Sequence, residues 1–147
     1  MRATIPDAYQ TVTPFPLVKG APRLIKFLKA AFDATELMRF HEPDGSVVHA
    51  EVKIGDSIMM IGEAMEGVPP MPASLHLYVV DADATYRAAL TAGGESLKQP
   101  INRFWGDRTA GIKDPAGNKW WITTQVEVAP DEIARGTQAS PSVGSTG

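Results

Sequence analysis

The sequence predicts an α+β fold made of two βαβββ modules, because its first half is repeated in pattern about 60 residues later. Residues 50–53 (Ala-Glu-Val-Lys) fall opposite residues 110–113 (Ala-Gly-Ile-Lys), and the amphipathic stretch 23–34 falls opposite 83–94. In each half an apolar run precedes a helix-like segment, which three strand-like segments follow. Such a unit buries itself most readily against its own copy. We therefore expect helices on one face of a curved mixed sheet and a cup on the other.

The composition is that of an ordinary globular protein. With 147 residues, 44% of them hydrophobic and 21% charged, the chain is long enough for one domain or two small modules. A formal charge of −3 without a basic stripe argues against a nucleic-acid partner. The absence of cysteine excludes disulfides and thiolate metal sites. No apolar run reaches the roughly 20 residues of a membrane span, and residues 1–6 lack a secretion signal, so we expect a cytoplasmic protein with no membrane partner.

Composition shifts divide the chain into five parts. Residues 1–9 are predicted to be an N-terminal arm, residues 10–62 the first module and residues 74–128 the second. Residues 63–73 are rich in proline and form the connector. From residue 129 to 147 the chain turns to Pro, Gly, Ser and Thr, which predicts a largely disordered tail with at most one helical turn at 130–135.

The first module begins with an extended segment over residues 11–19, in which Pro14 and Pro16 oppose helix and favour an edge or irregular strand. A helix opens at residues 20–22. Strands are predicted over 35–42, over 48–54, where apolar and polar residues alternate, and over 57–61, with turns at 43–46 and 55–56. The predicted buried face of the helix consists of apolar residues at helical spacing: Leu24, Ile25, Phe27, Leu28, Ala31 and Phe32.

The second module begins with an alternating strand over residues 74–79. Asp81 is a good N-cap for a helix that runs through Ala92 and stops at Gly93-Gly94. Strands over 96–99, 105–113 and 119–125 complete the module, with a turn at 114–118.

Four of these segments together resemble the vicinal oxygen chelate superfamily, which comprises glyoxalases, bleomycin-resistance proteins and extradiol dioxygenases. They are residues 50–57, 75–79, 104–108 (Phe-Trp-Gly-Asp-Arg) and 114–120 (Asp-Pro-Ala-Gly-Asn-Lys-Trp). The last two are most similar to the PhnB-like branch. The resemblance implies paired βαβββ modules that form an incomplete barrel, and usually a homodimer. It leaves function open, because this fold hosts metal enzymes and metal-free binding proteins alike.

Metal-dependent members of that superfamily place a His, Gln or Glu on the first and last strand of each module. Counting from Gly20, Val80, Gly55 and Gly117 brings those positions to Pro14, Met59, Ser74 and Trp121, none of which is a good ligand. A shift of two residues gives Thr11 or Pro16, Ile61, His76 and Thr123, and only His76 among them binds metals strongly. We therefore expect no metal and no other cofactor, with a divalent metal as the alternative.

Aromatic residues take the place of metal ligands in this prediction. Trp120 and Trp121 are adjacent in a strand and must face opposite sides, one under the helices and Trp121 toward the cup. Together with Phe15, Met59 and Tyr78, Trp121 would line a pocket for a flat hydrophobic or aromatic molecule. Alternatively, these side chains fill the barrel.

Three polar residues are candidates for catalysis. His76 lies on the polar side of its strand and would act as a general base or as a donor to a ligand, or else it is a partly exposed strand histidine. His49 and Glu51, two apart on one strand, would share a proton or bind a polar ligand in the cup. They could equally be solvated surface.

The segment 104–108 carries the densest local signal. Gly106 permits a sharp turn. In one interpretation Trp105 stacks on a flat ligand and Arg108 binds an anionic or carbonyl group. In the other, Asp107 pairs with Arg108 and Trp105 fills the seam between modules.

Three functions remain open from the sequence. The preferred one is a metal-free homodimer that binds a small organic molecule. The second is a metal-dependent lyase, isomerase or dioxygenase with an unusual ligand set built on His76 and His49 or Glu51. The third is a non-catalytic assembly or regulatory subunit with a filled cup.

Overall fold

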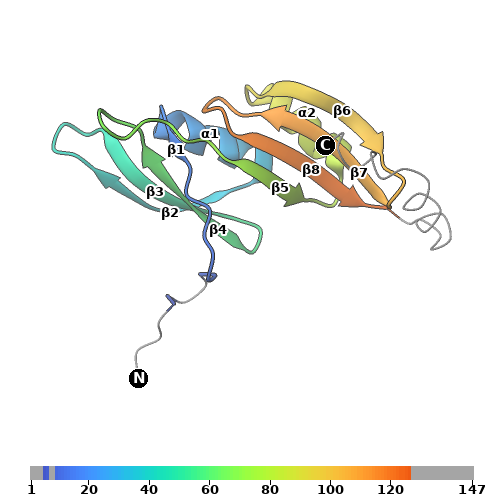
Figure 1. Ribbon diagram of the computed structural model, residues 1–147, viewed down its shortest axis with the longest axis horizontal. Helices are drawn as coiled ribbons and strands as arrows, with labels where there is room; N and C mark the ends of the chain where they lie inside the picture. The colour runs from blue at the N-terminus through green and yellow to red at the C-terminus, as the bar shows by residue number, and fades with distance from the viewer. Residues whose placement is uncertain (1–4, 7–8, 127–147) are drawn as a thin grey trace.

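The computed structural model describes residues 5–6 and 9–126, which contain both predicted modules (Figure 1). The predicted tail at 129–147, its helical turn and most of the arm at 1–9 lie outside the described residues. The first module comprises β1 (Leu17–Val18), α1 (Ala21–Phe32), β2 (Thr35–His41), β3 (Val47–Ile54) and β4 (Ser57–Glu63). The second comprises β5 (Ser74–Tyr78), α2 (Ala82–Thr91), β6 (Glu95–Asn102), β7 (Asp107–Lys113) and β8 (Lys119–Gln125).

Each module folds into its own four-stranded mixed sheet, in the order β1-β4-β3-β2 and β5-β8-β7-β6. The first strand of each module pairs in parallel with the last, and the other pairs are antiparallel. Figure 1 shows the two sheets side by side along the length of the molecule. The α+β fold with two βαβββ modules is therefore confirmed.

The predicted repeat holds at the level of single residues. Ala50 on β3 lies opposite Ile61 on β4, and Ala110 on β7 lies opposite Ile122 on β8. All four side chains are fully buried. The two modules thus bury equivalent positions of equivalent hairpins beneath their helices.

The first strand is short because of its prolines. Pro14 and Pro16 have no N–H to donate, but their carbonyl oxygens accept hydrogen bonds from the backbone N–H groups of Met60 and Gly62, at 2.9 and 3.1 Å. The chain therefore follows β4 for longer than the two residues of β1. This places residues 14–16 against the first sheet, as an irregular edge strand.

Side chains from the last strands hold the starts of both helices. Gly20 has no capping side chain, and the carboxylate of Glu63 instead accepts the N–H groups of Gly20 and Ala21, both at 2.8 Å. Asp81 caps α2, as predicted, by accepting the N–H of Ala84 at 3.1 Å. The hydroxyl of Thr124 on β8 accepts the N–H of Ala82. In both modules the last strand thus fixes the helix that crosses it.

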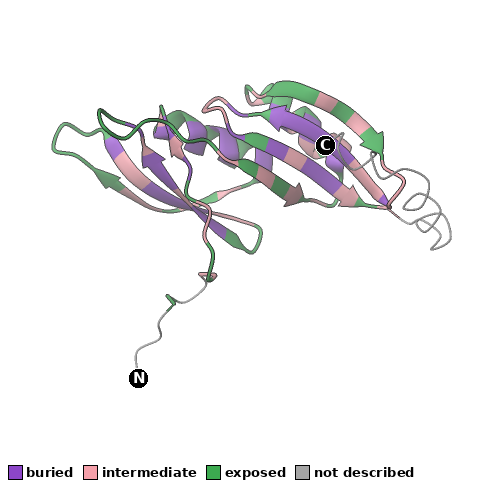
Figure 2. Ribbon diagram, in the orientation of Figure 1, coloured by how far each residue is buried: buried purple, intermediate pink, exposed green. Residues whose placement is uncertain are grey.

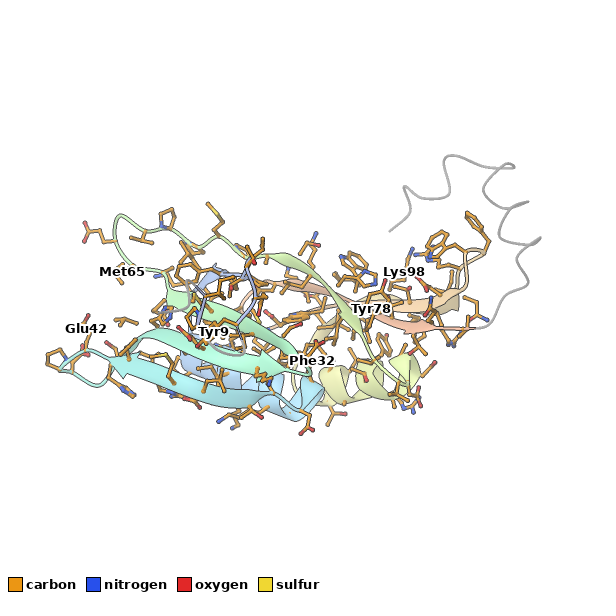
Figure 3. The ribbon with its side chains drawn as sticks, turned by 90° about the horizontal axis from the view of Figure 1, so that it is seen from below. Tyr9, Phe32, Glu42, Met65, Tyr78 and Lys98 are labelled. Carbon is orange, nitrogen blue, oxygen red and sulfur yellow. The ribbon has the colours of Figure 1, made fainter. Side chains whose placement is uncertain are left out.

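The predicted face of α1 is buried in full and forms part of a core shared by both modules (Figure 2). Phe32, at the end of α1, packs against Trp120 of β8 with 4.8 Å between ring centroids. In Figure 3, Phe32 lies near the middle of the molecule, between the two modules. The buried carboxylate of Asp114 accepts the indole N–H of Trp120 at 2.7 Å and organises the turn before β8.

Candidate functional site

The face of the second sheet that α2 leaves open carries a pocket of about 200 Å³, which we call the aromatic pocket. Its lining comes from β5, from the loop between β6 and β7, and from β7 and β8. The lining residues are His76, Arg103, Trp105, Asp107, Thr109 and Trp121. Three of these, His76, Trp105 and Trp121, are predicted ligand-binding residues, so the aromatic pocket brings together three of the seven that the sequence predicted.

Trp121 forms the floor of the aromatic pocket. A Cβ atom at Gly111 would lie 2.5 Å from the Cζ3 atom of Trp121, so the indole ring lies directly over the glycine on the neighbouring strand. The indole N–H of Trp121 donates to the hydroxyl of Ser74 at 3.0 Å. Trp120 faces the helices and is only 3% exposed. The prediction that the two tryptophans face opposite sides is therefore confirmed.

Trp105 forms a wall of the pocket and is held by its own turn. Its indole N–H donates to the carboxylate of Asp107 at 3.0 Å, and Phe104 meets its ring edge to face. Gly106, with φ of 102°, allows the sharp turn that the sequence indicated. The guanidinium of Arg103 lies 5.6 Å from the centroid of the Trp105 ring. The tight turn thus presents an indole and a cation to the same pocket.

His76 and Tyr78 lie side by side on the exposed face of β5, with 4.8 Å between ring centroids. Both also line a larger cleft of about 590 Å³ between the modules, which runs from the end of α1 and the β3–β4 hairpin to β5. Tyr78 is 70% exposed. His76 is therefore the one predicted residue shared by the cleft and the aromatic pocket.

The open face of the first sheet carries a hydrogen-bonded group instead. Glu51 is buried, and its carboxylate accepts the hydroxyl of Tyr9 and contacts Nε2 of His49 at 3.0 Å. The rings of Phe15 and Phe40 lie 5.6 and 6.0 Å from the imidazole of His49. Burial raises the pKa of Glu51, but the hydrogen bonds from Tyr9 and His49 lower that pKa by more, so it lies below its ordinary value. The pair is a satisfied internal contact beneath the segment that contains Tyr9 and Phe15.

Four predicted ligand-binding residues do not line the aromatic pocket. Met59 and Tyr78 line the larger cleft, whereas Phe15 and Arg108 line neither. Phe15 packs on the first sheet against His49, not beside Trp121. Arg108 points to the helix side of β7, where two of its guanidinium nitrogens donate to the carboxylate of Asp83 at 2.6 and 3.0 Å. The predicted pairing of Asp107 with Arg108 is wrong, since adjacent strand residues face opposite sides. The carboxylate of Asp107 accepts from Trp105, and Arg108 donates to Asp83.

The prediction that Met59 faces the cup with Trp121 is also wrong. Met59 lies opposite Val52, is 5% exposed and belongs to the core. The β3–β4 hairpin turns in two residues, after Ile54, whereas the β7–β8 hairpin uses the five residues between Lys113 and Lys119. Counting forward from the turn glycines therefore shifts the register by one, which exchanges the two faces. Met60, opposite Glu51, is the true counterpart of Trp121.

Arg103, Thr109 and Gly111 were not among the residues that the sequence indicated. A cation two residues before Trp105 in a tight turn is a usable signal for Arg103. The hydroxyl of Thr109 is hydrogen-bonded to the hydroxyl of Thr123 on the neighbouring strand, with 3.2 Å between the oxygens. Only the strand register shows that Thr109 and Gly111 share the face of Trp121.

The described residues do not fit the divalent cation that the dioxygenase and glyoxalase branches imply. No group of three or more His, Asp or Glu side chains within residues 5–6 and 9–126 is arranged to hold a metal ion. His49 and Glu51 are bonded to each other on the first sheet, while His76 lies on the second. Of the four positions inferred from the family, Ser74 is engaged by Trp121, and Met59 is in the core.

This arrangement defines a class of protein: a pair of βαβββ modules whose helices share one core and whose other sheet faces carry the aromatic pocket and the His49–Glu51 pair. The family model of the Glyoxalase/Bleomycin resistance protein/Dioxygenase superfamily matches residues 17–122, and the chain belongs to that superfamily. Within the described residues, neither helix is long and apolar enough to cross a membrane.

Known proteins resemble the chain in sequence and in fold. An uncharacterized protein from Mycobacterium bovis is 34% identical over 137 residues, covering 83% of this chain and 88% of that relative. TioX from Micromonospora sp. ML1 matches with a TM-score of 0.65 at 20% identity, covering 82% of this chain and 99% of that one. TnmS3 from Streptomyces sp. CB03234, described as an antibiotic binding protein, matches with a TM-score of 0.61 at 19% identity, covering 80% and 99%. At these identities the two structures show a shared fold.

Proposed function

We propose that this protein binds a flat, aromatic small molecule in the aromatic pocket, without a metal. One observation carries the proposal: two indoles, Trp105 and Trp121, line the same pocket while their N–H groups are bonded within the protein. They therefore offer apolar ring faces to a ligand. Stacking on such faces is favourable by roughly 0.5–1.5 kcal/mol per ring pair beyond the burial of apolar area.

The similarity to TnmS3 supports a binding role, since that protein is described as binding an antibiotic. The segments 104–108 and 114–120 support placement in the PhnB-like branch. We extend the proposal to a cytoplasmic protein, in keeping with the cysteine-free composition.

We further propose that the protein acts as a homodimer in which a second copy covers the exposed sheet faces. β5 is an edge strand of its sheet; Tyr78 at its end is 70% exposed and Val80 just beyond it is 96% exposed. An edge with exposed apolar side chains favours association with another chain. Sedimentation equilibrium of the purified protein tests this part, and a monomer at micromolar concentration would contradict it.

The binding proposal is tested by titrating planar aromatic compounds, such as naphthalene derivatives, while recording the indole N–H signals in NMR spectra. The chain has three tryptophans, and buried Trp120 serves as an internal control. We expect the signals of Trp105 and Trp121 to shift and the signal of Trp120 to stay. The variant Trp121→Ala should abolish the response. A response that survives in Trp121→Ala, or none with any planar compound, would contradict binding at this pocket.

Metal analysis of protein purified without a chelating column tests the metal-free part of the proposal. One equivalent of Fe, Mn, Ni or Zn per chain would favour the metal-dependent lyase, isomerase or dioxygenase instead. That result would return His76, His49 and Glu51 to consideration as ligands or as acid–base groups.

A further inference from the structure

We propose that the ligand is an aromatic molecule that carries a long apolar chain. Its ring lies in the aromatic pocket, and its chain passes the edge of β5 into the larger cleft between the modules. The inference rests on the proposed function and adds the chemical class of the ligand. It follows from the volumes of the two cavities, from the side chains that line the cleft and from the residue that both cavities share.

The aromatic pocket by itself is small for a ligand site. Its volume is about 200 Å³, whereas the cleft has a volume of about 590 Å³. Pockets for organic ligands usually enclose roughly 300–1,000 Å³. The aromatic pocket therefore has room for a ring system, and a ligand of ordinary size extends beyond it. The cleft has the volume for the remainder.

Side chains of both modules make the walls of the cleft apolar. The first module contributes the end of α1 and the β3–β4 hairpin, and the second contributes β5. Figure 3 shows Phe32 and Tyr78, one lining residue from each module, near the middle of the molecule. Among the described lining residues, the carboxylates are those of Asp33 and Asp56, both exposed, and none is a Lys or Arg. The cleft therefore favours an uncharged chain over one that ends in an acid.

The two cavities meet at His76. This residue lies opposite Trp121 in the parallel pair of β5 and β8, so its imidazole stands beside the indole that forms the pocket floor. Tyr78 follows on the same face, with 4.8 Å between the centroids of the two rings. Because β5 is an edge strand, Leu75 and Leu77 on its other face also line the cleft. A chain attached to a ring over Trp121 can thus pass His76 and round the edge of β5.

The chain would cover apolar surface that is otherwise in contact with water. Tyr78 and Val80 both line the cleft, and they are 70% and 96% exposed. Each methylene group that moves from water into apolar surroundings raises affinity by at most about fourfold. A chain of several methylene groups would therefore add more to the affinity than one stacked ring pair.

The test titrates N-methyl-, N-butyl- and N-hexyl-2-naphthamide, which share one ring system, while recording NMR spectra. We expect the Kd to fall at each step, by about tenfold or more from the methyl to the hexyl compound. The indole N–H signals of Trp105 and Trp121 should shift with all three compounds. The methyl signals of Leu75 and Leu77 should shift mainly with the longer two, while those of Leu37 on β2, which lines neither cavity, should stay. The same hexyl chain ending in a carboxylate should bind more weakly than the hexyl compound.

A pair of serine variants tests whether the chain enters the cleft. Ser57→Phe places a ring in the cleft from an exposed position of the β3–β4 hairpin. It should remove most of the gain from the hexyl chain and keep the affinity for the N-methyl compound. Ser46→Phe is the matched control, since both serines donate to the carboxylate of a nearby Asp in a hairpin, but Ser46 does not line the cleft. It should retain the full effect of chain length. Dispersed methyl and indole N–H signals without ligand confirm that each variant is folded.

The outcomes distinguish this inference from the proposed function. Equal affinity for the three compounds would overturn the inference and leave aromatic binding intact. A chain-length effect that persists in Ser57→Phe, without shifts at Leu75 and Leu77, would place the chain outside the cleft and overturn it as well. Methyl signals of Leu75 and Leu77 that change with protein concentration, and not with the ligand, would assign the cleft to a second copy of the chain. No shift of Trp105 or Trp121 with any of the three compounds would contradict the proposed function and this inference with it.

Discussion

The two sheets have equivalent strand orders, but the faces that their helices leave open carry different side chains. On the first sheet, the chain's own N-terminal segment lies over the strands, with Phe15 against His49 and Tyr9 bonded to buried Glu51. On the second sheet, the corresponding face holds the aromatic pocket. Within residues 5–6 and 9–126, the N-terminal segment covers the face of the first sheet, and no described segment covers the pocket on the second.

The strand register shows which substitutions cause this difference. The position of Glu51 on β3 corresponds to Gly111 on β7, and the position of Met60 on β4 corresponds to Trp121 on β8. In the first module the buried carboxylate of Glu51 occupies this face and accepts a hydrogen bond from Tyr9 of the N-terminal segment. In the second module a glycine makes room for an indole.

Glycines allow the close ring contacts on both faces, but with different partners. A Cβ at Gly62 would meet Leu17 at 2.8 Å and Phe15 at 3.0 Å, both side chains of the N-terminal segment. A Cβ at Gly111 would meet Trp121 of a central strand at 2.5 Å. The ring on the first face can move with its segment, whereas the ring on the second is fixed by the sheet.

The largest expected effect is a difference in stability between variants in the turns of the β3–β4 and β7–β8 hairpins. Asp114→Ala should lower the free energy of unfolding by about 3 kcal/mol, since it leaves the buried indole N–H of Trp120 and the amide of Asn118 without their acceptor. Asp56→Ala, in the exposed two-residue turn of the first hairpin, should change it by less than about 0.5 kcal/mol. Urea unfolding followed by circular dichroism measures both. Equal losses would show that the longer turn has no special structural role.

Much of the fold was predictable from the sequence because it depends on short patterns of apolar, capping and turn residues. The helical spacing of residues 24–32 and the N-cap at Asp81 depend on neighbours along the chain, and the repeat of Ala50 at Ala110 depends on a constant offset between the two halves. The buried face of α1 and the opposite directions of Trp120 and Trp121 follow from the same periodicities.

The rest of the site depends on hairpin lengths and on contacts distant in sequence. Because the turn of the first hairpin is shorter, counting from its glycine gave Met59 where the structure has Met60. The residues of the turn alone do not reveal this difference in register. Tyr9 meets Glu51 across 42 residues, and Arg108 meets Asp83 across 25. Such pairings cannot be counted from motifs, which is why Phe15, Met59 and Arg108 were misplaced.

A pair of glycine variants sharpens the comparison of the faces. Gly111→Ala should cost about 2 kcal/mol of stability and abolish the aromatic response, because the indole of Trp121 must leave its place on the strand. Gly62→Ala should cost less than about 1 kcal/mol, since the ends of flexible side chains can yield. Thermal unfolding and the NMR titration measure the two effects. A Gly111→Ala protein with undiminished ligand response would show that Trp121 does not form the floor of the site.

The closure of the first face is tested by Tyr9→Phe. Loss of the hydroxyl removes one hydrogen bond to the buried carboxylate of Glu51, so we expect a loss of about 1 kcal/mol. Amide hydrogen exchange should speed up at Met60 and Gly62, which bond to the N-terminal segment. Tyr86→Phe, which removes a hydroxyl bonded to Ser96 in the second module, should leave exchange at those two amides unchanged. Unaltered exchange in Tyr9→Phe would mean that the segment is held by its apolar contacts alone.

The smallest expected effect is a change in stability at acid pH, and it concerns β2, the outer edge strand of the first sheet. Hydrogen bonds from Arg39 and Lys29 lower the pKa of Glu36 on β2 to about 2. A carboxylate with a lowered pKa in the folded state stabilises the protein at a pH above its ordinary value near 4.5, and this contribution is lost as the pH falls toward 2. Glu36→Gln should therefore lower the urea midpoint at pH 6 and approach the parent protein at pH 2.5. Glu66→Gln, the same change at an exposed position of the connector, is the matched control. A Glu36→Gln deficit that stays constant between pH 6 and 2.5 would show that packing of the side chain, not its charge, stabilises this edge.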